Sequence, residues 1–361
     1  MRDLALALKR RGHIPMIYSP CLGEPAQELQ LKGISVVDDL NEVDASPDVI
    51  HGQHHLETMT ALLHFPGVPA AYFSHSAFHS QDSPPFFPRL FRYVAVDQDC
   101  YDKLVCKHGV PAEKVRLLLN FVNLEKFESR RPLPAQAQRA LLFSDYSKDD
   151  PYLAAVRKAC LHSGLHLDVV GLGMGNSHQH PEKLLGQYDI VFAKGRSALE
   201  ALAAGTAVVI YCMKSVGPMV TAGEVERFLP LNFGWQTMRH RLSPAEITRG
   251  LIDEIGRYDP ADAAQVSARV RALSNENAAI AKIISLYEEV IQEHTRVGAS
   301  TLGAEGPAAA AYVRWLSNLH QEELDELNNS SVIRLKQRLV SFPVFGKLAH
   351  LLARRLAGPS S

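Results

Sequence analysis

The sequence predicts an α/β protein built in two halves, each with a parallel sheet, followed by a helical tail. Short apolar segments of strand type alternate with segments of helix length. Strands that alternate with helices form βαβ units and therefore parallel sheets. The polar, proline-broken segment 128–138 interrupts this alternation once, and the alternation resumes behind it. We expect domains at 1–133 and 139–296, and a linker with a helical basic tail at 297–361.

The first half begins with an amphipathic helix at 2–11, in which leucines lie among basic residues. Segments of strand and helix type then follow in turn, which implies βαβ units. The strands are expected in "GHIPMIYSP", "ISVVDDL", "PDVIHGQ", "VPAAYFSHS", "FPRLFRYVAVD" and "KVRLLLNFV", and the helices in "HLETMTALLHF" and "CYDKLVCKHG".

In the second half, the strands are expected in "RALLFSD", "LHLDVVGLG", "DIVFAKG" and "TAVVIYC", with helices at 151–164, in "PEKLLGQY" and at 197–204. Gly205 ends the last of these helices, as glycine commonly does just beyond a helix. Gly217 and Pro218 predict a turn. Helices near 243–257, 262–273 and 276–294 are expected to close this half, and a small-residue linker at 298–311 leads to a tail helix at 312–328.

The composition narrows the classes of protein and partner. With 361 residues, 46% hydrophobic and 21% charged, the chain has the make-up of a soluble globular protein. A net charge of −1 gives no global basic field, so no nucleic-acid partner is expected. The five cysteines form no CxxC pair, which favours reduced thiols over disulfides or a zinc site. No apolar run of spanning length and no signal-peptide pattern is present, which predicts a cytoplasmic protein.

The most informative short segment is Lys194-Gly195-Arg196-Ser197, between the strand "YDIVFA" and a helix of small residues. A helix N-terminus offers free N–H groups and the positive end of the helix dipole, which favour phosphate. Gly195 lets a phosphate approach the backbone, and Arg196 can bind it through two hydrogen bonds. Ligands of open parallel sheets bind at the carboxyl ends of strands. The segment therefore predicts a diphosphate site, with a solvated basic loop as the alternative.

A second glycine-bearing loop follows the strand "LHLDVV". Gly171, Gly173 and Gly175 form a GxGxG pattern there, which alone is weak evidence for a nucleotide loop. His178 and His180 have no apparent third ligand, so they are interpreted as solvated loop residues and no metal site is expected.

Taken in order, these segments resemble those of the retaining, family-4-like glycosyltransferases of the GT-B fold, in which two Rossmann-like domains face a cleft. In that family a Gly-His turn follows the first helix, as in "KRRGHIPMIYSP" here. An Asn-Gly-Val-Asp…Phe signature closes the first domain, which here reads Asn120-Phe121-Val122-Asn123 with Phe127. An EAxAxG helix binds the donor, and Glu200 to Gly205 match it. The resemblance covers roughly residues 1–296.

The resemblance implies a retaining hexosyltransferase that moves a sugar from a nucleotide-sugar donor to a polysaccharide or a lipid-linked glycan. It implies two catalytic residues: His75, which faces the donor sugar, and Glu200, which holds the donor's ribose. No cofactor and no metal are expected, because the nucleotide sugar is a substrate. The residues expected to bind the donor are Lys148, Gly171, Gly173, Lys194, Gly195, Arg196 and Ser197.

Three features depart from the family's pattern. The family opens with a strand and a glycine-rich loop, whereas this sequence opens in the helix that follows them, so the first domain is expected to lack its first strand. Phe192 stands where the first of two glutamates is usual. Asp145, within "FSDYSKDD", stands near the place of the arginine of the phosphate clamp. Lys148 is then the clamp lysine, and Lys194 and Arg196 supply the missing charge.

Alternatives remain for one residue and for the activity. Ser197 and Glu200 have the spacing of a capping box, which accounts for Glu200 as well as ribose binding does. The activity has two rivals, a non-catalytic relative that binds a nucleotide sugar or a glycan, and a sugar-nucleotide epimerase of similar two-domain fold.

The segment 332–356 contains six Lys or Arg and no acidic residue, and its leucines at 348, 351, 352 and 356 share one helical face. A basic amphipathic segment of this kind suits an anionic membrane surface. A helix packed on the first domain is the alternative. We expect peripheral attachment to the inner face of a membrane.

Overall fold

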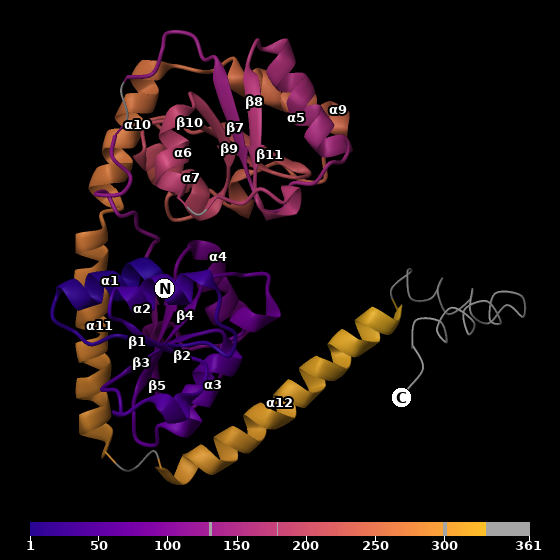
Figure 1. Cartoon of the computed structure of the whole chain (residues 1–361). Coiled ribbons are helices and arrows are strands. Elements are labelled where there is room, and N and C mark those ends of the chain that lie inside the picture. Colours follow the sequence, from indigo (N-terminus) through magenta and orange to yellow (C-terminus); the bar gives the residue numbers. More distant parts are fainter. Residues whose placement is uncertain (130–131, 179, 299–301, 330–361) are drawn as a thin grey trace, which may run out of the picture. The chain divides into compact units, whose positions relative to one another are not determined.

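The computed structural model describes residues 1–129, 132–178, 180–298 and 302–329 (Figure 1). Its strands form a two-stranded, a four-stranded and a five-stranded sheet. The pairs within these sheets are parallel, apart from the pair at one edge of the largest. The expected α/β class with parallel sheets is confirmed. Residues 1–85 and 89–298 form one compact unit that holds all three sheets, so the domain boundary between 133 and 139 stays a prediction.

Six parallel strands of the first half lie in two separate sheets. β1 (Met16–Tyr18) pairs with β2 (Ser35–Val37) alone. β3 (Ile50–Gln53), β4 (Ala70–Ser74), β5 (Leu90–Ala95) and β6 (Val115–Leu117) follow one another in the four-stranded sheet. The helices among them are α1 (Arg2–Arg10), α2 (Glu24–Leu31), α3 (His55–His64) and α4 (Gln98–Asp102).

The second half contains the five-stranded sheet, in the order β11-β10-β9-β7-β8. Its strands are β7 (Arg139–Phe143), β8 (His166–Val170), β9 (Ile190–Ala193), β10 (Ala207–Cys212) and β11 (Ser215–Met219). The predicted turn at Gly217 and Pro218 is wrong, because both residues lie in β11, which pairs antiparallel with β10. Proline is tolerated there because β11 is an edge strand. The helices of this half are α5 (Pro151–His162), α6 (Pro181–Leu184), α7 (Gly195–Ala203), α8 (Val225–Phe228), α9 (Pro244–Ile255) and α10 (Pro260–Leu273).

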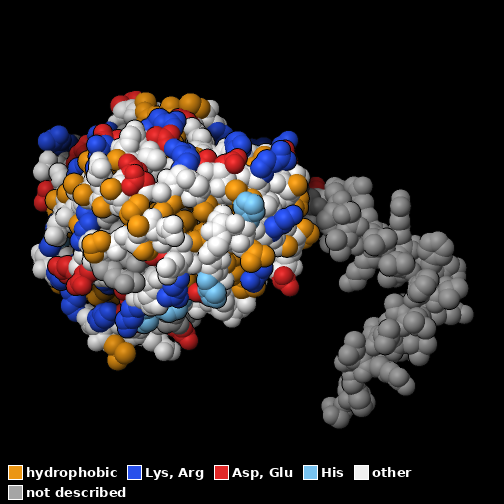
Figure 2. All heavy atoms as spheres, turned by 90° about the horizontal axis from the view of Figure 1, so that it is seen from above, with side chains coloured by type: hydrophobic (Ala, Val, Ile, Leu, Met, Phe, Trp, Pro, Cys, Tyr) orange, Lys and Arg blue, Asp and Glu red, His pale blue; other side chains and the backbone are white. Residues whose placement is uncertain are grey.

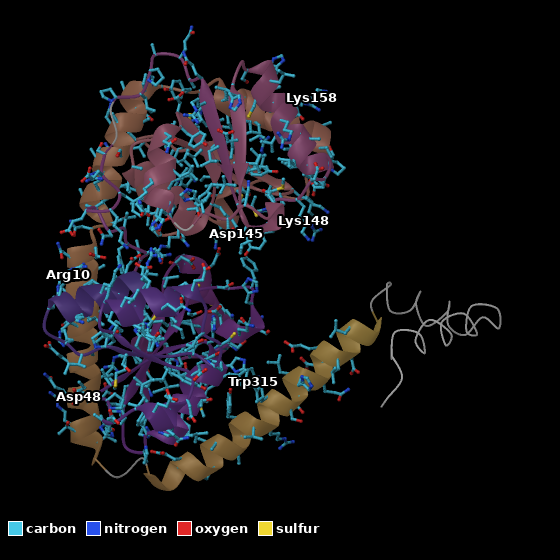
Figure 3. The ribbon with its side chains drawn as sticks, viewed as in Figure 1. Arg10, Asp48, Asp145, Lys148, Lys158 and Trp315 are labelled. Carbon is cyan, nitrogen blue, oxygen red and sulfur yellow. The ribbon has the colours of Figure 1, made fainter. Side chains whose placement is uncertain are left out.

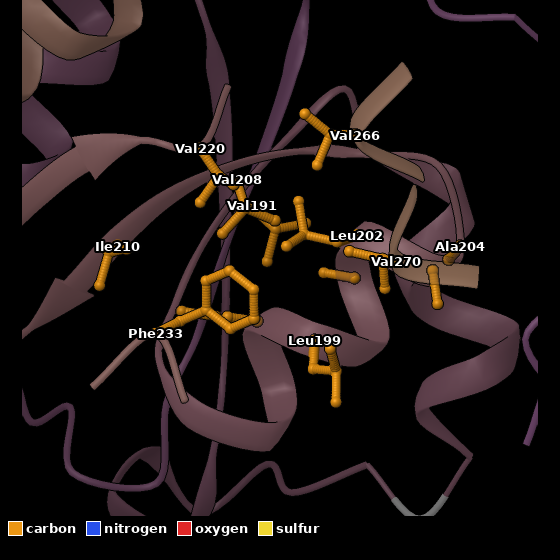
Figure 4. Close-up of a cluster of buried hydrophobic side chains, with 14 of the residues drawn as sticks. Val191, Leu199, Leu202, Ala204, Val208, Ile210, Val220, Phe233, Val266 and Val270 are labelled. Atoms are coloured by element: carbon orange, nitrogen blue, oxygen red, sulfur yellow. The ribbon is translucent and has the colours of Figure 1, made fainter. Parts of the chain in front are cut away.

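Apolar side chains cover both faces of this sheet, as expected of a parallel sheet between helices. On one face, Val191 and Val208 pack with Leu202 of α7 and Val266 of α10, all less than 2% exposed (Figure 4). On the other face, α5 and α9 cover neighbouring side chains of the same strands. This packing fixes the loops at the carboxyl ends of β7 and β9, where the predicted donor site lies.

Helix α11 (Glu276–Val297) packs against the first half, not the second. Its Ile280, Ile283, Leu286 and Val290 share a buried cluster with side chains of α1, β4 and β5. Arg92 of β5 also forms a 2.6 Å ion pair with Glu289. The prediction that 276–294 closes the second half is therefore wrong. The sequence predicts the helix and its apolar stripe, but it does not predict which sheet the stripe contacts.

Helix α12 (Leu302–Asn329) begins well before the predicted 312. Most of the expected linker at 298–311 is therefore helical, with Pro307 inside the helix. The run Ala308–Ala311 explains this, because alanine has the highest intrinsic helix propensity. The basic segment at 332–356 lies outside the described residues. Among the helices that are described, none has both the length and the apolar character needed to cross a membrane.

Candidate donor site

The central feature of the second half is the switch in direction of its sheet. The chain runs from β7 to β8 on one side and then returns to β9 on the other side of β7. Ligands of open α/β sheets bind at the carboxyl ends of the two strands that flank such a switch. The loops in question are 144–150, after β7, and the turn at Lys194, after β9. They meet where the Lys194 Nζ lies 5.2 Å from the centre of the Tyr146 ring.

Helix α7 starts at Gly195, earlier than its sequence suggests, with Lys194 as the N-cap residue. Gly195 has a φ of +60°, which a residue with a side chain adopts only with strain. Ser197 therefore lies inside the first turn, and the predicted capping box with Glu200 is wrong. The side chain of Lys194 makes no capping hydrogen bond to this helix end. The Gly195 N–H donates to the Phe233 carbonyl at 3.4 Å, so the amides of Arg196 and Ser197 and the positive end of the helix dipole are the groups offered to an anion.

The charge of Arg196 is already compensated by carboxylates. Its Nε donates to Glu200 at 2.8 Å and its Nη2 to Asp3 of α1 at 2.7 Å. Asp3 also accepts a 2.6 Å hydrogen bond from Lys126. Glu200 is only 8% exposed, and this burial raises the pKa of its carboxyl, although Arg196 opposes the change. In the described part of the chain no carboxylate contacts Lys194, so its charge is not compensated by an acid and its ammonium lies over the Tyr146 ring.

The glycines of the loop after β8 are required by the protein itself. A side chain at Gly171 would place its Cβ 2.0 Å from the Ser144 carbonyl oxygen, and one at Gly173 would come 2.2 Å from that of Ser147. Asp145 further ties the loops together by accepting from the Leu172 N–H at 3.0 Å. The two loops thus form one packed unit at the carboxyl ends of β7 and β8. Lys148, labelled with Asp145 in Figure 3, is exposed on the same unit.

His75 lies at the carboxyl end of β4, where its N–H donates to Asp82 at 2.8 Å. The pKa of its ring is lowered to about 4, chiefly because surrounding protein displaces water from the charged form, although the residue itself is exposed; Asp82 opposes the change, and the positive charges of the N-terminus and Arg196 add to it. The imidazole is therefore neutral at physiological pH. Its neighbour His51, within β3, stacks on Phe73 with the ring centroids 3.8 Å apart. Its Nδ1 lies 2.7 Å from the Tyr287 hydroxyl of α11, which fixes the ring.

Several of these contacts have little signal in the sequence. Tyr146 is the exception, since it lies in the loop after the first strand of the second half, where a ligand is expected. Asp3 is remote from Arg196 in sequence, and Tyr287 is on a helix assigned to the other half. Within the described residues, no group of three or more His, Cys, Asp or Glu is arranged to hold a metal ion.

A hollow of about 650 Å³ lies elsewhere, near the start of α10, and none of the predicted site residues lines it. Its charged residue, Arg271, donates to the carbonyls of Phe127 and Ala203 at 2.6 and 3.0 Å. A nucleotide needs polar partners that are not already engaged. The loops after β7 and β9 are therefore the better candidate site.

The structure is similar to that of a glycosyltransferase from Rickettsia africae. The TM-score is 0.58 at 14% identity, over 80% of this chain and 93% of that one. This chain has the GT-B fold. At that identity the similarity establishes the fold and not the activity. Sucrose-phosphate synthase from Thermosynechococcus elongatus, with a TM-score of 0.48 at 15% identity over 81% of this chain and 92% of that one, is too distant for further argument. No protein-family profile matches the sequence, and no curated protein matches it.

Proposed function

We propose that the protein is a glycosyltransferase that moves a hexose from a nucleotide-sugar donor to a polysaccharide or lipid-linked glycan. One observation carries this proposal. At the switch point of a parallel sheet in a GT-B fold lie the N-terminus of α7, which its N-cap side chain leaves open, and Lys194, which no described carboxylate contacts. In this position they would stabilise the negative charge that builds on a nucleoside diphosphate as it leaves the sugar.

The proposed donor site places the diphosphate against Lys194, Gly195 and Ser197, with Tyr146 beside it. The first-turn amides of α7 would donate to phosphate oxygens, and Lys194 would add a charge-assisted contact. Arg196 would contribute once phosphate competes with Asp3 and Glu200 for its guanidinium. No cofactor or metal is part of this proposal.

The proposed catalytic residues are His75 and Glu200. A neutral His75 can accept a hydrogen bond from a sugar hydroxyl or donate one to it, depending on the tautomer. Glu200 would hold the donor's ribose, as in the family that the sequence resembles. Retention of configuration at the anomeric carbon is proposed on the same ground, and NMR of the product sugar distinguishes it from inversion.

A non-catalytic relative that binds nucleotide sugars is the second candidate, and two observations favour it. Phe192 is fully buried in β9, where the family has a glutamate. Arg196 is held by two carboxylates. Incubation with a panel of radiolabelled nucleotide sugars separates the candidates. Transfer of label to a glycan supports the proposal, retention of intact donor supports the binding protein, and a changed sugar in free donor indicates an epimerase.

The location follows from the tail. We propose that the protein is cytoplasmic and that residues 332–356 attach it to an anionic membrane, near a lipid-linked acceptor. The support is the charge of that segment, six cations without an acid, and its leucine face. Each cation near an anionic surface contributes about 1 kcal/mol.

A further inference from the structure

Two exposed aromatic rings, Phe78 and Trp235, meet at the surface of the first compact unit. Their ring centroids are 5.8 Å apart with an interplanar angle of 61°. Phe78 is 69% exposed and Trp235 is 46% exposed. Aromatic side chains gain most by burial, so two that meet and remain exposed mark a surface that contacts something else.

The loop that carries Phe78 is rigidly held. The ammonium of Lys103, itself 5% exposed, donates to the carbonyls of Ser76 and His79 at 3.0 Å each. The Ser76 hydroxyl accepts from the N–H groups of Phe78 and His79 at 3.2 and 3.3 Å. The outward position of Phe78 is therefore fixed by its own loop, which reduces the entropy lost when a ligand binds.

The loop that carries Trp235 is equally constrained. The indole stacks on His240 at 3.6 Å with an angle of 10° between the rings. Two residues upstream, the buried Phe233 has a φ of +47°, and Asn232 before it has a φ of +51°. A bulky residue in the left-handed region is strained, and such strain collects at functional sites.

Each of the two loops adjoins one part of the proposed site. Phe78 follows His75 by three residues in the loop that leaves β4. The carbonyl of Phe233 accepts from the Gly195 N–H, at the start of α7, at 3.4 Å. A ligand on the two rings would therefore adjoin both the proposed sugar-facing histidine and the proposed diphosphate site.

A planar polar pair adjoins Trp235 in the sequence. The Gln236 amide, next to Trp235, donates to the Asp99 carboxylate, and the Gln98 amide donates to Asp102 at 2.8 Å. Both contacts are exposed. Carboxylates and amides are suited to neighbouring hydroxyl groups, because they accept and donate several hydrogen bonds in one plane.

We propose that Phe78 and Trp235 form a stacking platform for a pyranose ring of the acceptor, with Asp99 and Gln236 bound to its hydroxyls. This inference rests on the proposed function. The weakly positive C–H groups on one side of a pyranose are attracted to the negative face of an aromatic ring. An alkyl chain would cover the same rings but would offer no hydrogen-bond partner to Gln236 and Asp99, whereas the hydroxyls of a pyranose can join their exposed hydrogen bond.

Binding can be tested without any turnover. The sequence has two tryptophans, so Trp315→Phe leaves Trp235 as the one tryptophan, whose emission is excited selectively over that of tyrosine at the red edge of the absorption band. The full chain is first applied to an array of soluble oligosaccharides, and the glycans that bind are then titrated into the Trp315→Phe protein. We expect saturable quenching or a shift of Trp235 emission. We also expect Phe78→Ala to raise the Kd at least roughly ten-fold, whereas Leu161→Ala, at an 81% exposed leucine on α5, leaves it unchanged.

Each failure points to a different error. If no oligosaccharide on the array binds, or if glycans bind with no effect of Phe78→Ala or Trp235→Ala, the platform is refuted. If glycans bind on the platform but no nucleotide sugar is transferred or bound, the proposed function fails while the carbohydrate site stands. If the variants instead lose binding of a plain alkyl probe such as n-hexanol, the surface takes an apolar ligand and the inference is wrong.

Discussion

Asp3 is the residue whose replacement we expect to reveal most about this structure. It lies in the first turn of α1, where a negative charge is favoured by the helix dipole. Its carboxylate contacts Lys126 at 2.6 Å and Arg196 at 2.7 Å, with Arg2 at 3.6 Å. Burial alone would raise its pKa, but these three cations outweigh burial and hold the pKa of Asp3 at about 2.

The magnitude follows from the pKa difference. The ordinary value is 3.8 and the folded value about 2, and at about 1.36 kcal/mol per pH unit this amounts to roughly 2.4 kcal/mol at neutral pH. Arg196 is half exposed, so solvent screening reduces the figure to about 1–2 kcal/mol. Because the folded pKa is the lower one, the stabilisation is complete above pH 3.8 and disappears as the pH falls through about 2.

We expect Asp3→Asn to lower the free energy of unfolding by about 1–2 kcal/mol at pH 7. Urea unfolding followed by circular dichroism measures this, and with a slope of about 2–3 kcal/mol per molar the midpoint falls by roughly 0.3–1 M. The difference between wild type and variant should shrink between pH 4 and pH 2. Asp48→Asn, at an exposed carboxylate labelled in Figure 3, is the control. Equal midpoints at pH 7, or a difference that persists at pH 2, would refute the reasoning.

Three further outcomes are expected. Lys194→Ala should weaken the binding of a nucleoside diphosphate by about 1.5–3 kcal/mol and that of a nucleoside far less, as measured by calorimetry. An equal loss of affinity for both ligands would exclude the phosphate contact. Glu200→Gln should lower donor affinity, and it should also lower the melting temperature because it weakens the 2.8 Å contact with Arg196. Donor affinity that is unchanged in the folded variant, measured by calorimetry, would contradict a ribose role. The full chain should sediment with anionic vesicles at low salt, and a chain ending at 326 should not. Binding to the vesicles that persists at high salt, or in the truncated chain, would disprove the electrostatic attachment.

The sequence predicts local structure better than it predicts which distant parts meet. The alternation of strand-type and helix-type segments predicted the α/β class, and the run of small residues after Ser197 predicted α7, which the structure begins at Gly195. The capping box failed because Gly195, with its positive φ, starts the helix two residues before Ser197. The prediction of the sheet that α11 packs against failed because a helical apolar stripe of this kind fits the sheet of the first half and that of the second equally well. The face seen in Figure 2, where cationic and anionic side chains are interspersed, agrees with the near-zero net charge.

The same carboxylate that stabilises the fold competes with the proposed donor. A diphosphate that binds at the start of α7 must draw Arg196 away from Asp3 and Glu200, or bind without it. Asp3→Asn removes one of the two competitors and leaves the helix end and Lys194 unchanged. The variant should therefore unfold more easily and yet bind a nucleoside diphosphate more tightly. Calorimetric titration of the folded variant with the diphosphate measures the second effect. Affinity that falls together with stability would mean that Asp3 positions the site and does not oppose the ligand.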